Sequence, residues 1–133
     1  MTWRAPARDD RDVAALWALS AVGFVALRPL WLAAAAFLPS CPWHRLTGWP
    51  CPGCGSTRAV LGLLQGRVAA GFALNPLTAI ATTGFVACGL AAPLWLAAGG
   101  SVPVIGSRLR PGMIAAAAAI LAANWAWLLV SGI

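Results

Sequence analysis

Three apolar segments, each long enough to cross a lipid bilayer, constrain the fold of this chain more than any other feature. A helix needs about 20 residues to span a hydrocarbon core of roughly 30 Å. Residues 13–38, 76–98 and 112–133 meet that length. Because 61% of the residues are hydrophobic and only 9% are charged, the composition excludes a soluble globular domain of this size. We therefore predict an all-α integral membrane protein with about three transmembrane helices.

The other segments are arranged around these spans. Residues 1–12 are a charged tail, and residues 13–133 are predicted to form a single membrane domain. A cysteine-containing loop at residues 39–55 follows the first span. Residues 56–70 have an apolar and a polar face but are too short to cross a bilayer, which favours a short interfacial or re-entrant helix.

The distribution of arginines predicts the orientation in the membrane. The arginines on one side of the predicted spans are Arg4, Arg8, Arg11, Arg108 and Arg110, and those on the other side are Arg45, Arg58 and Arg67. Since positive charge is enriched on the cytoplasmic side, the N-terminus is predicted to be cytoplasmic and the cysteine loop to lie outside, where disulfides persist. The arginines are scattered at segment edges rather than clustered, so we expect contacts with the lipid bilayer and no nucleic-acid binding.

Acidic side chains are confined to the N-terminal tail, at Asp9, Asp10 and Asp12. This distribution excludes catalysis by paired carboxylates, carboxylate cages for metal ions, and proton relays through acidic residues within the membrane.

The loop sequence "CPWHRLTGWPCPGCG" contains a pattern of metal-binding residues, C-x2-H-x6-C-x2-C. Pro52 and Gly53 suit the central positions of a type II turn, in which the glycine has a positive φ, so the flanking cysteines are predicted to lie close together. A set of three cysteines and one histidine can close the tetrahedral shell of a zinc ion. The predicted ligands are Cys41, His44, Cys51 and Cys54.

Other interpretations of the same residues remain open. Cys41 could instead form a disulfide with Cys51 or Cys54, or the last two could form a redox pair with lowered pKa values. A third possibility is a nucleophilic Cys54 with His44 as its base, although no acidic residue is available to orient the imidazole. Cys88, in the middle of the second span, is predicted to be a small packing residue.

Polar residues at the spans suggest further contacts. Arg28 lies within the first span next to the helix-breaking Pro29, and it either extends to the lipid headgroups or forms an anion or lipid-headgroup site with Arg58. Asn75 is predicted to cap the second span. Asn124, in the third span, is predicted to form a hydrogen bond to another helix.

Residues 41–76, "CPWHRLTGWPCPGCGSTRAVLGLLQGRVAAGFALNP", resemble the signature of a family of small bacterial membrane proteins, domain of unknown function 2752. The resemblance lies in the Cys-Pro-x-Cys-Gly-x-Thr-Arg block and the later Asn-Pro. It implies a multi-pass protein of the bacterial cytoplasmic membrane and supplies no reaction.

The sequence therefore predicts a non-catalytic membrane module. Its Cys/His loop would be structural, through a disulfide or zinc, and its helices would pack on a second copy or another membrane protein. The alternative is a metal-handling or thiol-redox membrane protein that uses Cys41, His44, Cys51 and Cys54.

Overall fold

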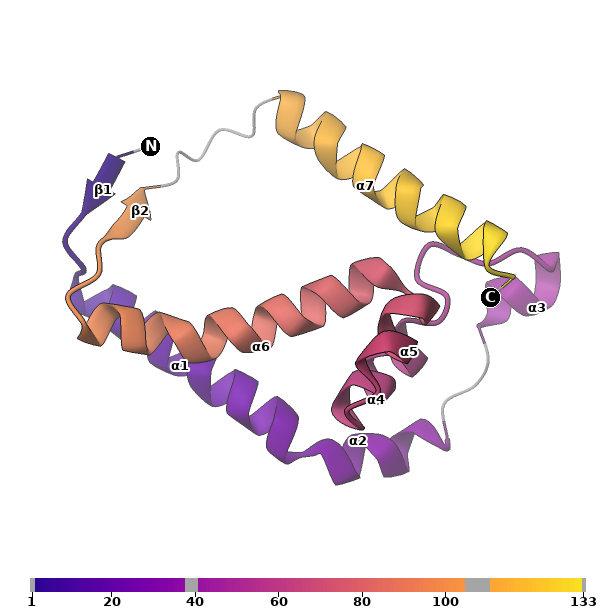
Figure 1. The fold of residues 1–133 in the computed structure, drawn as a ribbon, viewed down its shortest axis with the longest axis horizontal. Coiled ribbons are helices and arrows are strands. Elements are labelled where there is room, and N and C mark those ends of the chain that lie inside the picture. Colours follow the sequence, from indigo (N-terminus) through magenta and orange to yellow (C-terminus); the bar gives the residue numbers. More distant parts are fainter. Residues whose placement is uncertain (1, 38–40, 105–110, 133) are drawn as a thin grey trace. The chain divides into compact units, whose positions relative to one another are not determined.

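The computed structural model describes residues 2–37, 41–104 and 111–132 and is mostly helical, as predicted (Figure 1). The elements in chain order are β1 (Thr2–Arg4), α1 (Arg8–Ala26), α2 (Arg28–Ala35), α3 (Pro42–Thr47), α4 (Ser56–Leu64), α5 (Val68–Leu74), α6 (Pro76–Ala97), β2 (Val102–Val104) and α7 (Pro111–Val130).

Two of the described helices, α6 and α7, are long and apolar enough to cross a membrane. A third span is obtained when α1 and α2 are counted together as one broken span. The cysteine loop follows this broken span and precedes α6. Length and composition therefore support two to three membrane spans, where about three were predicted, with a cysteine cluster between the first two.

The first span differs from the single helix predicted for residues 13–38. Helix α1 begins at Arg8, within the predicted tail, and it ends at Ala26, while α2 runs from Arg28 to Ala35. Pro29 explains the break, because proline has no N–H to donate and its ring would clash with the carbonyl group four residues earlier in a continuous helix. The predicted end at Leu38 lies outside the described residues.

The described chain forms two compact units, of which the first comprises parts of residues 1–26 and 83–109. Here α1 packs on the second part of α6. The ring of Phe85 lies 6.2 Å from that of Trp17 and 6.5 Å from that of Phe24, measured between centroids. Strands β1 and β2 pair in antiparallel register, with Trp3 opposite Pro103. This short strand pair was not predicted from the sequence.

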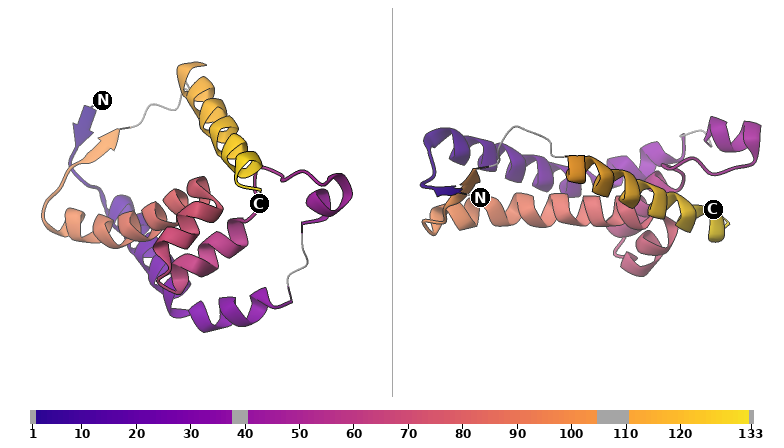
Figure 2. Two further views of the ribbon diagram at one scale, coloured as in Figure 1. Left: turned by 45° about the vertical axis from the view of Figure 1, so that its right-hand side comes forward. Right: turned by 90° about the horizontal axis from the view of Figure 1, so that it is seen from above.

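The second unit comprises parts of residues 27–82 and 110–133, including α4 and α5, which lie side by side (Figure 2). The sequence predicted one helix at residues 56–70, whereas the structure has two helices. Gly66, between them, has a φ of +78°. This left-handed conformation, which glycine adopts without steric cost, ends α4 and redirects the chain into α5.

The contact between α4 and α5 depends on Gly71. A Cβ atom at this position would lie 2.9 Å from Cγ of Leu63 and 3.1 Å from the carbonyl oxygen of Ala59. We expect Gly71→Ala to lower the free energy of unfolding by about 1–3 kcal/mol, because backbone and side chain would both have to shift. Gly84→Ala is the matched control, since a Cβ at Gly84 of α6 meets nothing within 4 Å. Equal thermal stability of the two variants in detergent would contradict this prediction.

Large apolar side chains are mostly exposed on the long helices, whereas the buried hydrophobic side chains are few and mostly small. Examples of exposed residues are Leu19 in α1, Leu94 in α6 and Ile114 in α7. Such continuous apolar surface is unusual for a soluble monomer and is expected for helices that contact lipid.

Candidate metal centre

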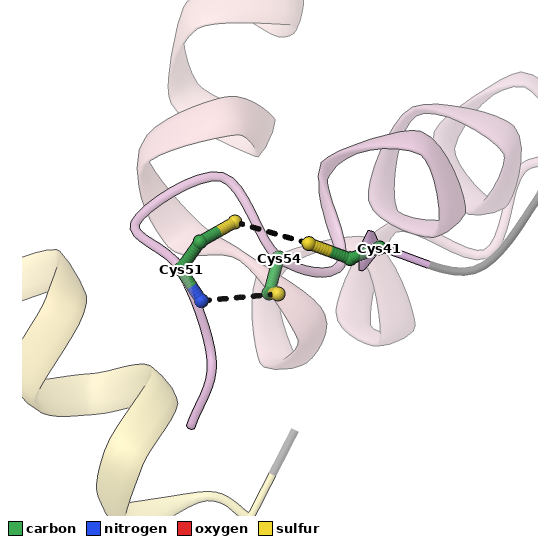
Figure 3. A group of neighbouring side chains, drawn as sticks. All are labelled: Cys41, Cys51 and Cys54. Atoms are coloured by element: carbon green, nitrogen blue, oxygen red, sulfur yellow. Dashed lines mark hydrogen bonds between the residues drawn. The ribbon is translucent and has the colours of Figure 1, made fainter. Parts of the chain in front are cut away.

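Three cysteines converge in the loop between α2 and α4 (Figure 3). Cys41 directly precedes α3, and Cys51 and Cys54 belong to the turn that leads into α4. Their Sγ atoms all lie within 4.8 Å of one another, and those of Cys41 and Cys51 are 3.6 Å apart. All three are free thiols. The structure therefore brings together three of the four predicted ligands.

The turn from Cys51 to Cys54 is closed by its own backbone. The N–H of Cys54 donates to the carbonyl oxygen of Cys51 at 2.9 Å, and the N–H of Cys51 donates to Sγ of Cys54 at 3.2 Å. The prediction of a type II turn was wrong, because the φ of Gly53 is not positive. The left-handed residue is instead Gly55, with a φ of +77°, because the chain is redirected there into α4.

Asn75 fixes this turn to the start of α6. Its amide nitrogen donates to the carbonyl oxygen of Cys54 at 3.0 Å and to Oγ of Ser56 at 3.3 Å. Its Oδ1 accepts from the N–H of Thr78 at 3.0 Å, which is the predicted helix cap. The side chain is only 1% exposed, so protein groups rather than water satisfy its polar atoms.

Helix α7 holds the same turn from another direction. Oδ1 of Asn124 accepts from the N–H of Leu77 in α6 at 3.0 Å, which confirms the predicted bond to another helix. Its amide nitrogen donates to the carbonyl oxygen of Pro52 at 3.3 Å. The indole N–H of Trp125 donates to the carbonyl oxygen of Pro50 at 2.9 Å. This role of Trp125 was not predicted from the sequence, where its position beside Asn124 was the available signal.

The surroundings of Cys41 and Cys54 shift the pKa values of their thiols in opposite directions. The backbone N–H of His44 lowers the pKa of the Cys41 thiol below its ordinary value, because it stabilises the thiolate. Burial, together with the hydrogen bond to Cys51, raises the pKa of the Cys54 thiol from 9.0 to about 11. Since this pKa lies above that of an unfolded thiol, the neutral thiol stabilises the metal-free fold below about pH 9. That contribution is lost as the pH rises through about 11.

These pKa directions predict different alkylation rates in the metal-free, reduced protein. At pH 7.5 we expect iodoacetamide to modify Cys41 at least about tenfold faster than Cys54, because Cys41 is more exposed and has the larger thiolate fraction. Peptide mass spectrometry after timed quenching measures both rates. Denaturation in detergent should make the two alkylation rates equal. Equal rates in the folded protein would contradict the prediction.

His44 is placed differently from the cysteines. It is exposed in α3 and is not part of the group of three sulfurs. The residue lines a cavity of about 280 Å³ together with Trp49, Pro50 and Leu128, and none of the three cysteines lines that cavity. The backbone of His44, rather than its ring, is therefore the part that acts on Cys41 in this conformation.

The arginines of the predicted anion site lie on two helices in contact. Arg28 is the first residue of α2, and Arg58 lies in the first turn of α4. Both side chains are exposed, so each is available to headgroup phosphates. Arg108 and Arg110, on which the predicted orientation also depends, lie outside the described residues.

Comparison with known proteins places the cysteine turn in a family. No curated protein and no solved structure matches the chain at a significant level. Residues 41–89 match the model of a family described as a protein of unknown function (DUF2752). The matched segment begins at Cys41 and includes the turn, α4, α5 and the first part of α6. Residues 41–89, which contain all three converging cysteines, are therefore a domain of the DUF2752 family.

Proposed function

We propose that this chain is a multi-pass membrane protein that binds one thiophilic metal ion, most simply zinc, through Cys41, Cys51 and Cys54. The metal would stabilise the loop and the helix ends attached to it, so the role is structural rather than catalytic. The observation that carries the proposal is the convergence of three sulfur atoms within 4.8 Å.

The sulfur separations suit a metal ion. A zinc–sulfur bond of about 2.3 Å places two sulfur ligands of a tetrahedral ion about 3.8 Å apart. The separation of 3.6 Å between Cys41 and Cys51 is close to that value, and Cys54 needs only a small movement. Backbone N–H groups directed at the sulfurs of Cys41 and Cys54 are of the kind that stabilise metal-bound thiolates.

Metal analysis of the purified protein tests the proposal. The full chain, reduced and equilibrated with zinc in detergent at neutral pH, is expected to retain about one zinc ion after dialysis. Cys41→Ser, Cys51→Ser and Cys54→Ser should each lose the ion, whereas Cys88→Ser, which changes an exposed thiol in α6, should retain it. A wild-type protein without stoichiometric metal, measured by elemental analysis and native mass spectrometry, would exclude the metal site.

A disulfide between Cys41 and Cys51 is the second candidate, and the distance of 3.6 Å between their sulfurs favours it. A disulfide bond measures about 2.05 Å, so closure requires a movement of about 1.5 Å. Intact mass without reductant distinguishes the candidates, since a disulfide removes two hydrogen atoms and a metal adds its own mass.

A nucleophilic Cys54 is disfavoured, because its thiol is buried and its pKa is raised to about 11.

The membrane contacts belong to the same proposal. The exposed apolar faces of α6 and α7 would contact lipid, a second copy of the chain or another membrane protein. Arg28 and Arg58 would contact lipid headgroups or another anion. The host membrane would be the bacterial cytoplasmic membrane, with the N-terminus in the cytoplasm and the cysteine loop outside.

Labelling of intact cells checks the orientation. After mild reduction and chelation, a membrane-impermeant maleimide is expected to label Cys41, because the loop faces outward. A cysteine introduced by Ala5→Cys should be labelled only after the cells are opened. Peptide mass spectrometry locates the label, and the reverse pattern would invert the proposed topology.

A further inference from the structure

We infer that the metal centre is open at its fourth coordination position and accepts an exogenous thiolate there. This inference rests on the proposed metal site and goes further, because it names the class of ligand that completes the site.

The number of protein ligands indicates an open site. Zinc in a closed structural site has four protein ligands, whereas three protein ligands leave a position for an outside molecule. Among the described residues, only Cys41, Cys51 and Cys54 form such a group. Three sulfur ligands define one face of a tetrahedron, so the fourth position faces away from them.

The chain offers few alternatives for the fourth ligand. Cys88 belongs to the other compact unit and is not a member of the group of three sulfurs. Met113 lies eleven residues before Asn124 in α7, about 16 Å from the other anchor of the turn. The unit that contains the triad has no Asp or Glu.

The single histidine of the chain does not close the site in this conformation. His44 presents its backbone N–H to Cys41 and helps to line the separate cavity beside Trp49 and Pro50. For the ring to become the fourth ligand, one of its nitrogens would have to move toward the three sulfurs, with which it is not grouped. His44 is therefore the residue of this chain that could compete with an outside thiolate for the fourth position, and the test includes a variant that lacks it.

Access and charge favour a thiolate as the outside ligand. Cys41 and Cys51 are only partly buried, so solvent reaches the triad at these two residues, while Cys54 is buried. The described charged side chains of this unit are all arginines, namely Arg28, Arg45, Arg58 and Arg67. Their positive potential favours an anionic sulfur ligand over a neutral imidazole or water, and a fourth thiolate completes a sulfur set that zinc commonly adopts.

Cobalt spectroscopy of the full chain in detergent tests this inference. Co²⁺ occupies tetrahedral zinc sites, and its visible and charge-transfer bands report the number of thiolate ligands. Titration of the cobalt-loaded protein with 2-mercaptoethanol is expected to change its absorption spectrum until one thiol is bound per cobalt. The intensity of the charge-transfer band should then rise by about one third, because the number of thiolate ligands rises from three to four. Ethylene glycol, the oxygen analogue, should produce no change, and His44→Ala should respond as the wild type does.

The other outcomes separate the two proposals. If wild-type protein binds cobalt but does not respond to the thiol, the site is closed and the inference is wrong, while the metal site stands. A response only in His44→Ala would identify His44 as the fourth ligand. Removal of cobalt by the thiol, measured by dialysis, would also overturn the inference, because no mixed complex forms. Failure of the wild type to bind cobalt or zinc at all would instead overturn the proposed function.

Discussion

Removal of the bound metal is expected to lower the free energy of unfolding by about 4 kcal/mol when free zinc is held at about 1,000 times its dissociation constant. The metal binds the folded loop, in which three sulfurs from two chain segments are already gathered, and an unfolded chain presents no such group. Replacement of Cys54 by serine should have the same effect and should abolish the response to chelator. Denaturant unfolding in detergent, with and without a chelator, measures the difference.

The control variant and the effect of chelator distinguish a metal ion from a disulfide. Cys88→Ser should leave the zinc-dependent stabilisation intact, since Cys88 is exposed in α6 and is not a member of the group of three sulfurs. Chelator should change the stability of the wild type and of Cys88→Ser equally. If chelator has no effect on the wild type, while oxidation protects it against unfolding, the loop is held by a disulfide and not by a metal ion.

The parts of this fold that the sequence predicted correctly depend on local rules. Helices α6 and α7 are apolar over the length that a bilayer span requires, and the cap at Asn75 follows from its position before Pro76. The convergence of Cys51 with Cys54 follows from their spacing in a turn. These features need no knowledge of distant parts of the chain, because each is determined within a few residues or within one helix.

The features that the sequence did not predict have two causes. Either two local preferences compete within one segment, or residues far apart in the sequence come into contact. Apolar continuity predicted one first span, but Pro29 broke it into α1 and α2. Gly53 lacks the positive φ that the type II turn required, whereas Gly55, which lets the chain leave the turn, has one, since the path into α4 decides where the chain reverses. The bond between Trp125 and Pro50 joins residues 75 positions apart, and no periodicity of the sequence encodes such a pairing.

Replacement of Asn75 by alanine is the second change with a large expected effect, although Asn75 is not a metal ligand. The variant loses one hydrogen bond to the turn, one to Ser56 at the start of α4 and one within the start of α6, at a site that is 1% exposed. We expect a loss of about 2–4 kcal/mol in the free energy of unfolding, from the helix cap and the unsatisfied backbone groups. Zinc affinity should fall about 10- to 100-fold, as is typical when the groups that orient metal ligands are removed.

Asn75→Ser separates the two roles of this side chain. Serine can still accept the N–H of Thr78 and cap α6, but its short side chain cannot replace the amide that donates to both Cys54 and Ser56. Competition with a zinc-binding dye is expected to show weakened metal binding in Asn75→Ser, with most of the stability of the metal-free protein retained. Asn124→Ala should weaken metal binding independently, because it releases the carbonyl group of Pro52 from α7. If both variants bind zinc as tightly as the wild type, the two asparagines support the helices alone, and the geometry of the triad is determined by the turn itself.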